Sequence, residues 1–341
     1  VAKPLDDAKK PAAAAAAAAA ADLAWLRPYT GYPEAKAPKP EELRLWRGEE
    51  VNAGSYSLPR MTHAEALADP LKLMRGVMEH AIVIIDDVPE SADASTLHSF
   101  VADALGGLQK DPARDEVNWK ITKRVGATSI SYDHDKRLNN HTDSSIPPHG
   151  IPAVLLIMHY LAGKGHNTLV DGFAVAKQLR EEDPEAFELL ATYGYDGERD
   201  FIASRGDSGQ KLSDGSLLVT RRHPIFDLDA DGELRRITYN EVFRMPLTLP
   251  FDEFEGYFNA LNKFVKMLHA PEFEVDVPMQ AGRMLVMQNW RLLHGRAGGK
   301  ASTSRTVVGG TVLREAFFSK ATQLLGARGE DLHGVFSAEE E

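Results

Sequence analysis

Two histidines and an aspartate are the residues of this sequence whose types and spacing point most directly to chemistry. His141 and Asp143 stand two positions apart, so in an extended strand both side chains point to the same face. His294 follows the apolar segment 284–287 and is expected at a strand end. Two imidazoles and one carboxylate on one side of a metal leave three positions open, as iron(II) oxygen chemistry requires. We therefore predict that these three residues are catalytic and bind a metal.

Two further residues have the chemistry to hold a carboxylate near such a metal. Arg305 follows His294 by 11 residues, and Thr168 follows Asp143 by 25 residues. A guanidinium can bind a carboxylate through two parallel hydrogen bonds, and a threonine hydroxyl can add another. We expect Arg305 and Thr168 to anchor the far end of a dicarboxylate cosubstrate that chelates the metal at its near end. Arg296 is expected either beside this cosubstrate or at a charged rim.

The elements that must position these residues are mostly short strands. Apolar residues recur at helical spacing over 64–80, and helices are also predicted at 94–105, 173–190 and 251–268. The predicted strands are 81–89, 125–132, 153–161, 167–170, 200–203, 216–220, 236–239, 284–289 and 305–312. Many strands with few helices favour an α+β fold, mainly β, built around a barrel or a sandwich.

Composition divides the chain into three parts. Residues 1–21 form a low-complexity tail that ends in ten alanines. We predict that residues 22–60 form a small N-terminal appendage packed on the main body, because they contain several prolines and the apolar Trp25 and Trp46. Residues 61–341 then form the main domain, which is long enough to bury a large core.

Charge and the absence of cysteine exclude several classes of function. The formal net charge is -11, so we expect neither nucleic acid nor anionic membrane as a main partner, and instead a small-molecule substrate. With no cysteine, disulfides, thiol nucleophiles and cysteine-ligated metals are ruled out. No stretch approaches the length of a membrane helix, and we see no intact signal peptide, so we expect a soluble protein of the cytoplasm or an organelle matrix such as that of mitochondria.

Five motifs together resemble one known family. They are HTD at 141–143, TLVDGF at 168–173, PEAFELL at 184–190, NWRLLHGR at 289–296 and SR at 304–305. In order and spacing the chain is similar, over about residues 65–325, to the gamma-butyrobetaine and trimethyllysine dioxygenases of the taurine-dioxygenase-like superfamily. The resemblance implies a double-stranded β-helix (jelly-roll) core. It also implies Fe(II), 2-oxoglutarate and dioxygen as cofactor and cosubstrates, with ascorbate in support.

The same resemblance implies a set of substrate-binding residues. Family members that bind a trimethylammonium group enclose it with aromatic faces. Trp119 and Tyr132 stand about where two of these aromatic residues are expected, with ordinary packing as the alternative. Ser144 and Thr311 stand where many members carry tyrosine, and Asn240 lies in a segment that reaches the substrate side in the family.

These residues lead to an expected activity with its alternatives. We expect hydroxylation of an unactivated C–H bond in a small amino-acid-like or betaine-like substrate, with trimethyllysine, in carnitine biosynthesis, as the first candidate. The alternatives are the same chemistry on a sulfonate, a phosphonate or another amino acid, or a non-catalytic jelly-roll protein that binds metal. Butyrobetaine enzymes carry an N-terminal zinc site built largely from cysteines, which cannot exist here, so a homodimer through that region is left open.

Overall fold

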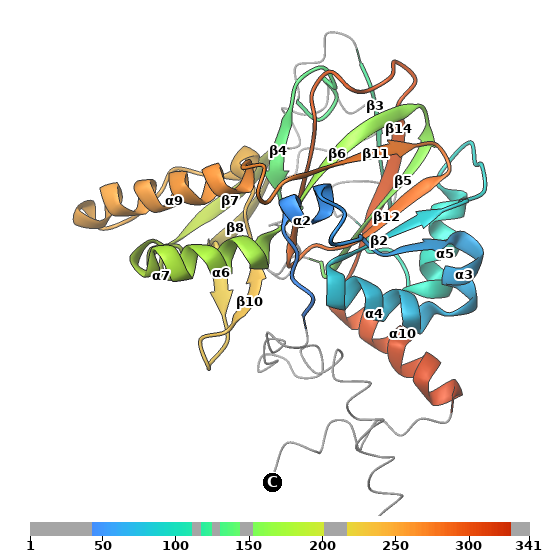
Figure 1. Ribbon diagram of the computed structural model, residues 1–341, viewed down its shortest axis with the longest axis horizontal. Coiled ribbons are helices and arrows are strands. Elements are labelled where there is room, and N and C mark those ends of the chain that lie inside the picture. The colour runs from blue at the N-terminus through green and yellow to red at the C-terminus, as the bar shows by residue number, and fades with distance from the viewer. Residues whose placement is uncertain (1–42, 111–116, 125–129, 144–152, 201–216, 329–341) are drawn as a thin grey trace, which may run out of the picture.

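The computed structural model describes residues 43–110, 117–124, 130–143, 153–200 and 217–328 (Figure 1). Two β-sheets form its centre. The larger sheet has six strands in the order β1-β2-β12-β5-β14-β3, and the smaller has four in the order β11-β6-β13-β4. Apart from the parallel pair β1 and β2, the strands of both sheets pair antiparallel. The predicted mainly β fold is thereby confirmed.

The strands of the two large sheets are short and come from distant parts of the chain. Those of the larger sheet are β1 (Arg60–Thr62), β2 (Ile82–Asp86), β3 (Trp119–Thr122), β5 (Leu155–Ala162), β12 (Arg283–Gln288) and β14 (Thr306–Val312). Those of the smaller sheet are β4 (Leu138–His141), β6 (Lys164–Asp171), β11 (Val275–Gln280) and β13 (Leu292–Arg296). Two further hairpins are β7 (Gly194–Asp200) with β8 (Leu217–Pro224), and β9 (Phe226–Leu228) with β10 (Leu234–Ile237).

The space between the two large sheets is filled by one hydrophobic cluster. It takes alternate residues from both sheets, which is how two sheets packed face to face build a core. The buried members on the larger sheet are Ile82, Ile84, Leu156, Met158, Tyr160, Leu285, Met287 and Val307, and those on the smaller are Leu169, Val275, Val277, Met279 and Leu292. The faces that carry these residues are called the inner faces below.

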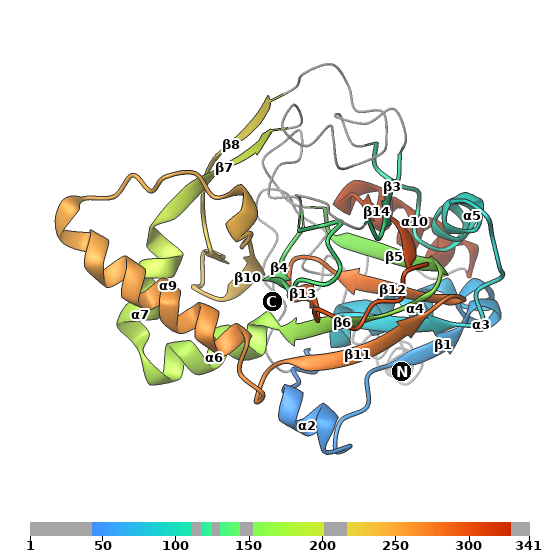
Figure 2. The ribbon, with the colours of Figure 1, turned by 90° about the horizontal axis from the view of Figure 1, so that it is seen from above.

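Helices cover the outer face of the six-stranded sheet and pack at one end of the four-stranded sheet, as Figures 1 and 2 show from two directions. The six-stranded sheet packs its outer face on α3 (His63–Ala68), α4 (Pro70–His80), α5 (Ser95–Ala104) and α10 (Arg314–Ala327). The four-stranded sheet and the small hairpin β9–β10 pack on α6 (Gly172–Glu182), α7 (Pro184–Thr192) and α9 (Phe254–Leu268). The remaining elements are α2 (Gly48–Asn52), η3 (Glu241–Phe243) and η4 (Phe251–Glu253).

Two predicted helices are each divided by an Asp-Pro pair. The helix expected over 64–80 splits into α3 and α4 at Asp69, whose carboxylate accepts from the Lys72 amide and so caps the second helix. The helix expected over 173–190 splits into α6 and α7 in the same way, with Asp183 accepting from the Ala186 amide. Proline disfavours helical backbone in the residue before it, which makes that residue a natural N-cap.

The segment before β1 packs on the main body. Trp46 is 1% exposed, its backbone N–H donates to Asp171, and its indole N–H donates to the carbonyl of His80. Residues 1–42 lie outside the described residues, so the tail at 1–21 and the appendage at 22–60 stay predictions as units of the fold.

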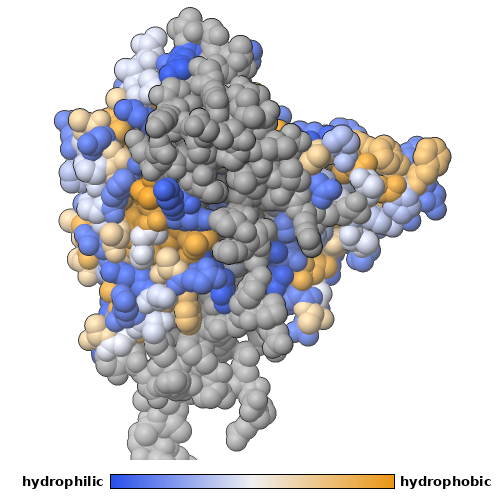
Figure 3. Space-filling model, turned by 180° about the vertical axis from the view of Figure 1, so that it is seen from behind, coloured by the Kyte–Doolittle hydropathy of each residue, from blue (hydrophilic) through white to orange (hydrophobic). Residues whose placement is uncertain are grey.

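None of the described helices is long and apolar enough to cross a bilayer. On the face opposite to that of Figure 1, hydrophilic side chains are mixed with small apolar groups (Figure 3).

A fully buried ion pair joins the two layers of helices to the sheets. The Arg291 guanidinium donates to both carboxylate oxygens of Asp171, at 3.0 and 2.6 Å, and both side chains have no exposed surface. Asp171 also accepts from the amide of Phe173 at the start of α6, and Arg291 also donates to the carbonyls of Glu79 and Arg44. These contacts satisfy the polar groups of both partners, which a buried charge pair requires.

Replacing Asp171 by Asn should therefore destabilise the protein strongly, because it leaves the Arg291 charge buried and uncompensated. We expect the free energy of unfolding, measured by urea titration, to fall by about 3–5 kcal/mol. The matched control is Glu241→Gln, which removes an ion pair with Arg244 whose carboxylate is half exposed, and which should cost under about 1 kcal/mol. Similar small losses in both variants would contradict this role of Asp171.

Candidate metal centre

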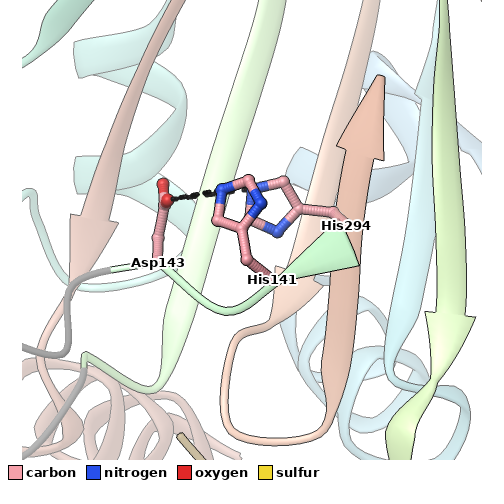
Figure 4. A group of neighbouring side chains, drawn as sticks. All are labelled: His141, Asp143 and His294. Atoms are coloured by element: carbon pink, nitrogen blue, oxygen red, sulfur yellow. Dashed lines mark ion pairs between the residues drawn. The ribbon is translucent and has the colours of Figure 1, made fainter. Parts of the chain in front are cut away.

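The three predicted metal ligands come together on the inner face of the smaller sheet. His141 ends β4 and is the register partner of His294 in β13, so the two side chains share a face. Their ring centroids lie 4.5 Å apart. Asp143 follows β4, and its Oδ1 lies 3.4 Å from Nε2 of His141 and 3.8 Å from Nε2 of His294 (Figure 4). One potential ligand atom from each residue lies within 4.8 Å of the other two, as a shared metal ion would need.

Both imidazoles are prepared to act as ligands. Nδ1 of His141 lies 2.7 Å from the carbonyl oxygen of Asn139, which can only accept, so Nδ1 donates to it and Nε2 is the nitrogen that faces Asp143. Burial, together with the nearby His141 and against the attraction of Asp143, lowers the pKa of His294 to about 3, so its ring is neutral at physiological pH. Two imidazoles and one carboxylate fit a divalent metal with open positions on one side.

Two asparagines fix the backbone that carries Asp143. The Asn289 side chain accepts from the Asp143 amide at 2.8 Å and donates to the Asp143 carbonyl at 2.8 Å. The second is Asn240, a predicted substrate residue. Its side-chain amide donates to the Thr142 carbonyl at 3.3 Å and accepts from the backbone amide of Val242. Asn240 is 2% exposed and thus supports the ligand loop, and its contact with substrate stays a prediction.

Arg305 lies buried between the two sheets, directly before β14. Nη2 donates to the Tyr160 hydroxyl at 2.9 Å, and Nη1 lies 3.2 Å from Nε2 of His134. A Cβ atom on Gly165 of β6 would come within 2.8 Å of Arg305 Nε, so the guanidinium passes close over that strand. Among the described residues the partners of Arg305 are Tyr160 and His134 and include no carboxylate, and its buried Nε has no hydrogen-bond partner.

Arg296 lies beside Arg305 but contacts mostly backbone. Its guanidinium donates to the carbonyls of Ile130, Ser131, Asp133 and Lys136, and so fixes the loop that precedes β4. Burial and then the Arg305 charge lower the pKa of Arg296 to about 10. Its predicted part in cosubstrate binding stays a prediction.

The structure does not bring Thr168 together with Arg305. Thr168 pairs with Gly295, whereas its neighbour Leu169 pairs with His294, so Thr168 points to the outer face of the sheet. Its hydroxyl donates to Oδ1 of Asn140 at 2.7 Å. The expectation that Thr168 and Arg305 hold one carboxylate together therefore does not match this arrangement.

The remaining predicted substrate residues are found in three settings. Trp119 and Thr311 lie on the inner face, because Trp119 packs against the inter-sheet cluster and Thr311 pairs with the buried Leu156. A Cβ atom on Gly309 would lie 2.1 Å from the Trp119 ring, so this glycine makes room for the indole. Tyr132 is buried, with the Arg124 guanidinium 5.8 Å from its ring centroid. Ser144 lies outside the described residues.

Three residues around Arg305 were not singled out as site residues from the sequence. His134, Tyr160 and Asn167 are all fully or almost fully buried. Tyr160 donates to Asn167, and its ring lies 5.0 Å from the guanidinium carbon of Arg305. The one available signal was a histidine and an asparagine close in sequence to the HTD and TLVDGF motifs, which is too weak to assign a role.

Replacing Asn289 by Ala should loosen Asp143 without removing a ligand. We expect the affinity for Co(II) or Mn(II), measured by calorimetric titration, to fall by about 10–100-fold, as for other residues that orient metal ligands. Asn259→Ala is the matched control, because Asn259 is exposed on α9. If a folded N289A protein bound the metal with an affinity within twofold of the wild type, the role of Asn289 in fixing Asp143 would be refuted.

Comparison with curated proteins finds dioxygenases. The chain is 33% identical over 283 residues to the mitochondrial trimethyllysine dioxygenase of Homo sapiens, covering 81% of this chain and 62% of the relative. It is 30% identical over 188 residues to the gamma-butyrobetaine dioxygenase of the same organism, covering 54% of this chain and 46% of the relative. The bacterial gamma-butyrobetaine dioxygenase of Pseudomonas sp. (strain AK-1) is 26% identical over 311 residues, covering 87% and 73%. The chain thus spans about half to three quarters of the length of these relatives.

Solved structures share the fold at low sequence identity. PvcB, an Fe, alpha-ketoglutarate dependent oxygenase from an isonitrile synthetic pathway, superposes with a TM-score of 0.51 at 17% identity, covering 74% of this chain and 82% of that one. The non-heme iron oxygenase OrfP in complex with Fe superposes with a TM-score of 0.50 at 15% sequence identity. The match covers 76% of this chain and 94% of the OrfP chain. The expected jelly-roll core is thereby confirmed. The model of the family described as taurine catabolism dioxygenase TauD, TfdA matches residues 48–311, and the chain belongs to this family.

Proposed function

We propose that this protein is an Fe(II)- and 2-oxoglutarate-dependent dioxygenase that hydroxylates a C–H bond of a small molecule. One observation carries the proposal, namely the ligand atoms of His141, Asp143 and His294 within 4.8 Å of one another on the inner face. The match to the family and the dioxygenase relatives support it. Bound iron(II) would supply the activation of dioxygen, which no protein side chain provides.

Arg305 is proposed to bind the distal carboxylate of 2-oxoglutarate. The residue is 4% exposed, and the partners of its guanidinium among the described residues are neutral. A buried charge without a counter-charge is costly, so an anionic ligand is the natural partner. The adjacent Arg296 adds a second positive charge to the same region, which attracts a dianion within an otherwise acidic protein.

The substrate is proposed to be a small amino-acid-like or betaine-like molecule, with trimethyllysine as the first candidate. The names of the relatives support this choice, as does the indole of Trp119 on the inner face. The Arg124 guanidinium already lies over Tyr132, which argues against a cage that uses this ring for a second cation. A sulfonate, phosphonate or other amino acid is therefore the second candidate.

A mitochondrial matrix or cytoplasmic location is proposed on the same basis, because the human and bovine trimethyllysine dioxygenases are mitochondrial by name. Imaging of the tagged full-length protein tests it, and secretion would contradict it.

The activity is tested with purified protein, Fe(II), ascorbate and 2-oxoglutarate. We expect succinate formation to be stimulated by one member of a panel of N-methylated lysines, betaines, sulfonates and aminophosphonates, and to be lost in His294→Ala. Anaerobic addition of 2-oxoglutarate to the Fe(II) protein should also give a visible charge-transfer band. Absence of both the band and succinate would favour a non-catalytic metal-binding protein.

Arg305→Gln should weaken the cosubstrate selectively. Loss of a buried, charge-assisted pair with a carboxylate should raise the KM for 2-oxoglutarate by about 100-fold, since such pairs are worth about 3 kcal/mol. The affinity for Fe(II) should stay within twofold, because Arg305 contacts none of the three ligands. An unchanged KM in R305Q would remove Arg305 from cosubstrate binding.

A further inference from the structure

The Arg305 guanidinium is held by neutral side chains from two separate elements. Tyr160 of β5 accepts from Nη2 at 2.9 Å, and its ring lies 5.0 Å from the guanidinium carbon. His134, in the loop before β4, lies 3.2 Å from Nη1 through its Nε2. Since a guanidinium always donates, this Nε2 acts as an acceptor. Burial, followed by the charges of Arg305 and Arg296, lowers the pKa of His134 to about 3, which keeps that lone pair available.

A chain of hydrogen bonds connects this guanidinium to the backbone of the metal-binding strand. The Tyr160 hydroxyl, which accepts from Arg305, donates in turn to Oδ1 of Asn167 on β6. The Asn167 amide then donates to the carbonyl oxygen of Gly295 at 3.3 Å. Gly295 directly follows the ligand His294 in β13. The chain therefore runs from the proposed carboxylate anchor to the residue beside a metal ligand, through side chains that are at least 98% buried.

The arrangement leaves the guanidinium free to bind an anion. Of the five N–H donors of Arg305, Tyr160 and His134 take one each. The buried Nε has no partner among the described residues. A long arginine side chain has many rotamers, and partners on both terminal nitrogens restrict it to one. The hydrogen bonds through Tyr160 and Asn167 thus fix both the position of the Arg305 guanidinium and the direction in which it points.

We propose that Tyr160 and Asn167, with His134, are positioning residues that fix the Arg305 guanidinium relative to His294 and thereby select the chain length of the cosubstrate. A 2-oxo dicarboxylate must reach both the metal and the guanidinium, so the separation of these two points sets how many methylene groups fit between them. The inference rests on the proposed function, in that Arg305 binds the distal carboxylate of 2-oxoglutarate.

Tyr160→Phe keeps the ring and removes only the hydroxyl that joins Arg305 to Asn167. Binding of 2-oxoglutarate and of the one-carbon-longer 2-oxoadipate to the Fe(II) protein is measured by anaerobic calorimetry, which involves no turnover. We expect Y160F to bind 2-oxoglutarate about tenfold more weakly, as expected when a hydrogen bond to a charged group is lost. We also expect its preference for 2-oxoglutarate over 2-oxoadipate to shrink, and its affinity for Fe(II) to stay within twofold.

Tyr257→Phe is the matched control, because Tyr257 is a fully buried tyrosine in the helical cluster around α9 whose hydroxyl has no partner among the described residues. This variant should bind both 2-oxo acids as the wild type does. Asn167→Ser gives a second test should Y160F fail to fold, with weaker binding and lower selectivity expected in the same direction.

The outcomes separate this inference from the proposed function. Wild-type protein that binds Fe(II) but no 2-oxoglutarate would overturn the proposed function and this inference with it. Wild-type binding, together with a folded Y160F or N167S protein of unchanged affinity and selectivity, would overturn the positioning role alone.

Discussion

The buried ion pair between Asp171 and Arg291 is the contact on which the rest of the structure depends. Asp171 ends β6 and starts α6, while Arg291 lies in the turn between β12 and β13. Asp171 also accepts from the backbone amide of Trp46, and Arg291 also donates to the carbonyl of Glu79 near the end of α4. Four segments far apart in sequence therefore meet at one pair of charges, and the turn they fix leads directly into the strand that carries His294.

The same core contains a second kind of buried cation. Arg291 has its carboxylate, whereas Arg305 and Arg296 contact only neutral groups among the described residues. Buried charges of this kind persist in folded proteins where a ligand completes them. The contrast supports the proposal that Arg305 binds an anion in a chain whose net charge is -11.

The metal centre could be predicted from the sequence because its ligands are marked by local rules. Alternation along a strand predicts one side for His141 and Asp143, although β4 ends at His141 and Asp143 follows it. His294 is expected at a strand end but lies in the middle of β13. The faces of other residues depend on strand register, where a shift of one position reverses every side chain. Thr168 illustrates this, since its outward position follows from its pairing with Gly295. The contacts of His134 and Tyr160 with Arg305 join residues 171 and 145 positions apart, and no local pattern predicts them.

The direct pairing of His141 with His294 across β4 and β13 has a consequence for the entropy of metal binding. A metal that joined these two residues in an otherwise open chain would have to close a loop of some 150 residues, with the loss of chain freedom that such closure brings. Here the strand pairing has already closed that loop. The two histidines are thus held side by side by the strand pairing, and metal can enter or leave without the fold having to form or dissolve around it.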